Sequence, residues 1–158
     1  MKPASEIESP RILWVAVLTI FVSVILVLAV REAAVRILHP SPAFAPLTLG
    51  PPIIDTIIAV TLAIFVFITV AFYSHSVTLW RWIATGTLLL SFLPDVSLAK
   101  SHEMGGGWPE AYALMIMHVV AWSVCVTLLP GLAFSASPSR DRRGSPLSIL
   151  GTIPNPPR

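Results

Sequence analysis

Three side chains that can ionise lie within the long apolar stretches of this sequence: Asp55, Asp95 and His118. A charged group deep in a bilayer costs several kcal/mol, so such residues tend to face a bundle interior or water. At 3.6 residues per turn, Asp55 lies about one turn into its stretch, Asp95 about one turn before the end of its stretch, and His118 about two turns into the last. Helices that cross a membrane together would hold all three at similar depth. The sequence therefore predicts a candidate intramembrane polar cluster.

His118 has a functional and a structural interpretation. As a functional group it would be a proton relay, a metal ligand or a haem ligand. As a structural group it would be a neutral imidazole bonded to a carboxylate or hydroxyl on a neighbouring helix, and this interpretation is favoured. Haem between helices would need a second histidine at matching depth, which the sequence lacks. A metal site from Asp95, His102 and His118 with Glu103 or Glu110 would have irregular spacing. We therefore predict neither a metal nor a cofactor.

The two aspartates also have two interpretations. If water reaches them from outside, Asp55 and Asp95 would bind a cation or accept a proton. Alternatively, each reaches the membrane surface and stays hydrated, or pairs with Arg31 or Arg36, and this second interpretation is favoured. The sequence contains no Gly-x-Ser-x-Gly nucleophile motif and no phosphate-binding loop. The protein is expected not to be an enzyme.

The elements that must position these residues are four apolar stretches. A helix needs roughly 20 residues to cross a hydrocarbon core of about 30 Å, and each stretch approaches that length. The chain is 55% hydrophobic and 11% charged, whereas soluble domains carry about 25% charged residues. The predicted fold is all-α, a four-transmembrane-helix bundle with spans at about 12–30, 53–73, 82–99 and 111–130.

The remaining residues suggest how the chain is divided. We expect an N-terminal segment at 1–10, a transmembrane domain at 11–134 and a flexible tail at 135–158, which is rich in Ser, Pro and Arg. Lys and Arg are retained on the cytoplasmic side of a membrane. Seven of the ten lie in the termini and the middle joint, against three in the other two loops. Both termini are therefore predicted to be cytoplasmic.

Prolines and charges predict several helix ends. The first helix is expected to continue past the bilayer to about Leu38, with a Glu32–Arg36 pair at i, i+4, before two prolines end it. A Pro-Pro pair at 51–52 suits the first turn of the second helix. The third helix is expected to kink at Pro94 and continue to about residue 99. Pro130 and the following glycine are expected to close the fourth helix.

Small and hydroxyl side chains recur at helical spacing in all four spans, as expected where membrane helices approach closely. The predicted helix-packing residues are Thr19, Ser23, Ala59, Ala63, Thr87, Ser91, Ala121 and Cys125. Aromatic and cationic side chains near helix ends favour the headgroup boundary. The predicted interface anchors are Trp80, Arg81, Trp82 and Trp108.

The third and fourth stretches resemble a family of small bacterial four-helix membrane proteins, a domain of unknown function. The resemblance is carried by the run Leu88-Leu89-Leu90-Ser91-Phe92-Leu93-Pro94, by Ala113 to Val120, and by Val126 to Pro130-Gly131. It covers about residues 45–133. In that family a Leu-Met-His or Met-His-Leu step opens the second half of the last helix, and His118 would be its counterpart. The resemblance implies a four-helix bundle and no known activity.

Two classes of function remain. The first is an accessory or interaction subunit that packs in a larger membrane assembly, either with another membrane protein or as a homo-oligomer. The second is a small transporter, proton-coupled device or sensor that uses the intramembrane Asp and His residues. The lipid bilayer is the expected surrounding, in the bacterial inner (cytoplasmic) membrane. Nucleic acid is not an expected partner, because the basic residues form no stripe.

Overall fold

The computed structural model of the chain describes residues 9–42, 44–74, 76–102 and 105–134. These residues form four long helices and one short 3-10 helix: α1 (Ser9–Leu38), η1 (Ala45–Leu47), α2 (Gly50–Tyr73), α3 (Val77–Ser101) and α4 (Trp108–Phe134). No strand occurs among them. The predicted all-α fold with four helices is therefore confirmed. The expected N-terminal segment up to residue 8 and the expected tail at 135–158 lie outside the described residues.

Each of the four long helices has the length and composition of a membrane span. The shortest, α2, has 24 residues, which at 1.5 Å per residue is about 36 Å and exceeds a bilayer core of about 30 Å. Large apolar side chains point outward on every helix, among them Phe21, Phe65, Leu89 and Ile116. Such a surface would aggregate in water, whereas lipid solvates it. The protein is an integral membrane protein.

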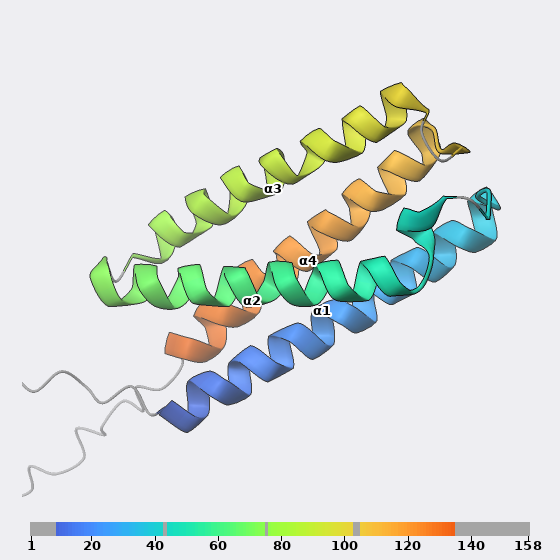
Figure 1. The fold of residues 1–158 in the computed structure, drawn as a ribbon. Coiled ribbons are helices and arrows are strands. Elements are labelled where there is room, and N and C mark those ends of the chain that lie inside the picture. Colours follow the sequence, from blue (N-terminus) through green and yellow to red (C-terminus); the bar gives the residue numbers. More distant parts are fainter. Residues whose placement is uncertain (1–8, 43, 75, 103–104, 135–158) are drawn as a thin grey trace, which may run out of the picture.

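The helices run alternately in opposite directions (Figure 1). α1 packs against α4 and α2, while α3 packs mainly along α4. The α2–α3 turn lies at the end of the bundle where α1 begins and α4 ends, and the other two connections lie at the opposite end (Figure 1). From their shared turn, α2 and α3 diverge (Figure 1). These two helices are antiparallel, whereas the side of the membrane that the termini face stays a prediction.

The far end of α1 is tied to the loop that follows it. Arg31 Nε donates a hydrogen bond of 2.9 Å to the carbonyl oxygen of Leu47, and the Leu47 side chain is buried beside Phe44. The helix ends at Leu38, as predicted. The loop therefore folds back onto the bundle.

Glu32 holds both arginines at this end of α1. Its carboxylate lies 3.1 Å from Arg36 Nε and 3.2 Å from Arg31 Nη1. The predicted Glu32–Arg36 pair is confirmed. Within the described residues, the two arginines pair with Glu32 and not with Asp55 or Asp95.

The starts of α2 and α3 follow from local chemistry. Pro51 and Pro52 occupy the first turn of α2, as predicted, because the first backbone N–H groups of a helix have no intrahelical acceptor. At the start of α3, Ser76 Oγ accepts a hydrogen bond of 3.2 Å from the backbone N–H of Leu79. Such an N-cap satisfies one of those free donors.

Two prolines lie inside helices without ending them. α3 continues past Pro94 to Ser101, two residues beyond the predicted end. α4 continues past Pro130 to Phe134, so the prediction that Pro130 and Gly131 close this helix is wrong. A proline removes a single backbone donor, and spanning helices tolerate this because neighbouring groups and local adjustments compensate.

The buried residues form two clusters. The larger joins all four helices near the α2–α3 turn and includes Val60, Ile64, Phe67, Val70, Trp80 and Leu129. The smaller lies toward the loop after α1 and consists of Val27, Phe44, Leu47 and Met117. One cluster therefore lies near the α2–α3 turn, and the other lies near the loop after α1.

Trp80 belongs to the larger cluster, so its prediction as an interface anchor is wrong. Its side chain is 1% exposed, and its ring lies 5.3 Å from the Phe67 ring in an edge-to-face arrangement. Successive helical residues point about 100° apart. Trp80, Arg81 and Trp82 therefore cannot share one face: the first enters the bundle, while Arg81 and Trp82 are exposed.

Gly106 is required where the connection before α4 meets Phe44. A Cβ on Gly106 would overlap the buried Phe44 ring. We expect Gly106→Ala to lower the free energy of unfolding by about 1–3 kcal/mol, the usual cost of overpacking. Gly107→Ala is the matched control, because its Cβ would meet its neighbours at an ordinary 3.6 Å. Unfolding in mixed detergent micelles measures both, and equal losses would contradict the steric explanation.

Candidate functional site

Asp95 on α3 and His118 on α4 meet inside the membrane region. His118 Nε2 lies 3.4 Å from Asp95 Oδ2, with the Asp95 side chain 8% exposed and the His118 side chain 39% exposed. The separation is short enough for an ion pair, but its geometry does not make a hydrogen bond, and Oδ2 has no other partner among the described residues. The pair therefore joins α3 to α4 by electrostatic contact.

Asp55 does not join this pair. It is exposed on α2, about one turn from the helix start, and it forms no ion pair with the described residues. This position suits a hydrated carboxylate at the membrane surface. Of the three predicted residues, the structure brings together two.

The predicted packing residues fall into two groups. Thr19 and Ser23 on α1 are fully buried. The hydroxyl of Thr19 donates to the carbonyl oxygen of Val15 at 2.7 Å, whereas Ser23 Oγ has no hydrogen-bond partner among the described residues. Small hydroxyl residues at these positions let α1 approach its neighbours closely.

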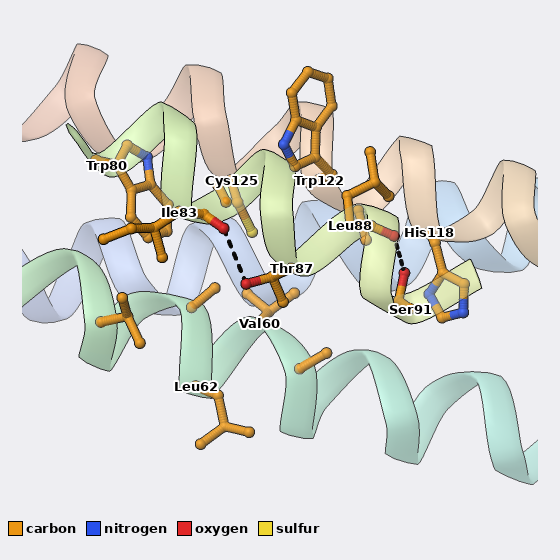
Figure 2. Close-up of a pocket in the computed structure, with 15 residues that line it drawn as sticks. Val60, Leu62, Trp80, Ile83, Thr87, Leu88, Ser91, His118, Trp122 and Cys125 are labelled. Carbon is orange, nitrogen blue, oxygen red and sulfur yellow. Dashed lines mark hydrogen bonds between the residues drawn. The ribbon is translucent and has the colours of Figure 1, made fainter. Parts of the chain in front are cut away.

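The other six packing residues line a groove where α2 and α3 diverge, with α4 as its floor (Figure 2). They are Ala59, Ala63, Thr87, Ser91, Ala121 and Cys125. The groove has a volume of about 260 Å³. Ala59 and Thr87 are exposed in it, although they were expected to be buried between helices. The small residues of α2 and α3 line the same groove, because the two helices stand apart there.

The groove is apolar along most of its length. Its two hydroxyl groups are satisfied by their own helix: Thr87 Oγ1 donates to Ile83 O at 3.0 Å, and Ser91 Oγ donates to Leu88 O at 2.7 Å (Figure 2). His118 points in beside Ser91 at one end, and Trp80 lies toward the other (Figure 2). The imidazole is therefore the polar group that the groove offers to an occupant.

The sequence interpretation missed Trp122 as a groove residue. Its position four residues after His118 places it on the same side of α4, so helical spacing was the available signal. Its indole Nε1 is buried without a hydrogen-bond partner among the described residues. The Trp122 ring therefore lines the groove, but its buried donor is not open to an occupant.

The remaining predicted anchors lie near helix starts, and their role as interface anchors stays a prediction. Arg81 is exposed, and Trp82 is 73% exposed near the start of α3. Trp108 begins α4 and lies 5.9 Å from the Tyr112 ring. These two aromatic positions are near opposite ends of the bundle, where amphipathic rings favour the headgroup region.

Metal ligation finds no support in the described geometry. No three His, Cys, Asp or Glu side chains of the described residues gather closely enough to hold an ion. Glu110 is used locally, because its carboxylate accepts a hydrogen bond of 2.8 Å from the backbone N–H of Gly107. Glu103, which the alternative metal site invoked, lies outside the described residues.

Comparison of the chain with models of protein families, with curated proteins and with solved structures finds no match. The resemblance at about residues 45–133 to small bacterial four-helix membrane proteins therefore stays a prediction. The chain's own geometry offers four helices of membrane-spanning length, an Asp95–His118 pair and an apolar groove.

Proposed function

We propose that this integral membrane protein is a non-enzymatic accessory or interaction subunit, and that a transmembrane helix of a larger membrane protein covers α3. One observation carries the proposal: α3 is the least apolar of the four spans and also the least buried. Lipid solvates hydroxyl and charged side chains poorly. The helix that most needs protein cover therefore receives the least of it within this chain.

The outer face of α3 has the spacing of a helix-packing surface. Its exposed residues include Trp82, Gly86, Leu89, Leu93 and Ser97, which recur at intervals of three or four and so share one side of the helix. Nothing lies within 4 Å of a Cβ placed on Gly86. A glycine in open space lets a second backbone approach closely, as at other helix contacts in membranes.

Gly86→Leu tests this proposal. The added side chain would hold the partner helix away, so we expect the variant to lose a complex that co-purifies with the wild-type protein in mild detergent. Ala29→Leu is the matched control, because it adds similar bulk at an exposed position on α1. The proposal fails if Gly86→Leu keeps the complex, or if the wild-type protein elutes alone. A wild-type homo-oligomer lost in Gly86→Leu would identify the partner as a second copy.

A small transporter, proton-coupled device or sensor is the second candidate, favoured by the Asp95–His118 contact of 3.4 Å. It ranks second because the adjoining groove is lined mainly by apolar side chains, and proton or ion movement requires water or a polar chain. Proton flux into vesicles that contain the purified protein tests it. Flux that disappears in Asp95→Asn, while the fold is retained, would reverse the ranking.

A further inference from the structure

The groove between α2 and α3 combines an apolar body with one polar end. Its walls carry the methyl side chains of Ala59, Ala63 and Ala84, and its hydroxyl groups are already bonded to the backbone. At the polar end, His118 turns Nε2 toward Asp95. Within the described residues no hydrogen bond occupies its other nitrogen, Nδ1. An occupant would therefore meet hydrocarbon along most of its length and an imidazole at one end.

Charge neutrality decides what Nδ1 offers. Asp95 is more than nine-tenths buried, so a net charge on the pair would be costly at this depth. A carboxylate beside an imidazolium is a neutral arrangement that needs no hydrogen bond between Asp95 and Nε2. In this arrangement Nδ1 carries a proton. An occupant that presents a hydrogen-bond acceptor to His118 suits this arrangement.

We propose that this groove binds a neutral, lipid-soluble carbonyl compound of the quinone type, with its chain along the alanines and its carbonyl oxygen accepting a hydrogen bond from His118 Nδ1. A negatively charged acceptor such as a fatty acid would leave a net charge beside Asp95, so a neutral carbonyl fits better. The site does not overlap the outer face of α3, and the proposal is independent of a protein partner.

The depth of His118 argues against ordinary phospholipid as the source of the carbonyl. His118 lies ten residues after the start of α4 at Trp108, which is about 15 Å along the helix. Phospholipid ester groups belong to the interfacial region outside the hydrocarbon core. A molecule dissolved within the hydrocarbon reaches His118 through the opening between α2 and α3, whereas an ester at the surface does not.

Two probes with alkyl chains of similar length test the proposal on the full-length protein in phosphatidylcholine nanodiscs. Decylubiquinone carries carbonyl groups, whereas decylbenzene carries none. Trp80 and Trp122 line the groove, so a bound quinone should quench tryptophan fluorescence in a saturable way. Decylbenzene should compete about tenfold more weakly, the factor that corresponds to one hydrogen bond to a polarised group. Quinone dissolved in the lipid gives a quenching component that does not saturate.

Three variants locate the site. His118→Phe should weaken the binding of decylubiquinone about tenfold, to the affinity of decylbenzene. Ala63→Leu should weaken the binding of both probes, because its side chain fills the groove. Ala29→Leu on α1 should leave the affinity for both probes unchanged. The comparison of probes on the wild-type protein keeps the test valid if His118→Phe does not fold. Equal affinity for both probes would overturn carbonyl recognition. Unchanged binding in Ala63→Leu would contradict the groove as the binding site. So would native mass spectrometry that finds a phospholipid in the groove.

Discussion

Replacing Trp80 with alanine is expected to lower the free energy of unfolding by about 3–5 kcal/mol, as for other large-to-small changes in a packed interior. The indole is 1% exposed and packs edge-to-face on Phe67 at 5.3 Å. It lies in the cluster near the α2–α3 turn, where these two helices are closest before they diverge. Its loss would leave a cavity at the point that holds α3 to the rest of the bundle.

Trp82→Ala is the matched control for Trp80→Ala. Trp82 is two residues further along the same helix but is 73% exposed, so its truncation should cost well under 1 kcal/mol of unfolding free energy. Reversible unfolding in mixed detergent micelles, followed by circular dichroism, measures both variants. Similar losses at the two positions would mean that Trp80 is not part of the packed interior.

The second large effect is expected at the Asp95–His118 pair. His118→Leu should destabilise the protein by about 3 kcal/mol, because it leaves a buried carboxyl without its partner. Adding Asp95→Leu in the same chain should recover much of this loss, since a buried pair replaced by apolar residues is often nearly neutral. The double variant should therefore be more stable than the sum of the two single variants predicts.

A double-mutant cycle measures this coupling. Unfolding free energies of the wild type, both single variants and the double variant should give a coupling of at least about 1 kcal/mol, as expected for residues in direct contact. Asp55→Leu combined with His118→Leu is the control, because Asp55 is exposed on α2 and lies outside the pair. Additive effects of Asp95→Leu and His118→Leu would contradict an energetic role for the contact.

The length and polarity of the apolar runs were enough to predict the four spans. A polypeptide segment in lipid must satisfy its own backbone hydrogen bonds, so a run of about 20 apolar residues has one common solution. Local rules also held at Glu32–Arg36, at the Pro51–Pro52 start of α2 and at the Leu38 end of α1. They failed at Pro130, because a lost backbone donor weakens a helix without always ending it.

The sequence by itself determined how deep each residue lies along its helix, and tertiary structure decided which way each residue faces. Asp55, Asp95 and His118 were predicted at similar depth, yet only the rotation of α3 and α4 brings Asp95 to His118 while Asp55 stays exposed. The same rotation buries Trp80. The divergence of α2 from α3 leaves small residues that were expected to pack between helices lining an open groove. Rotation and divergence depend on the sum of many small packing contacts between helices, which no single periodic pattern contains.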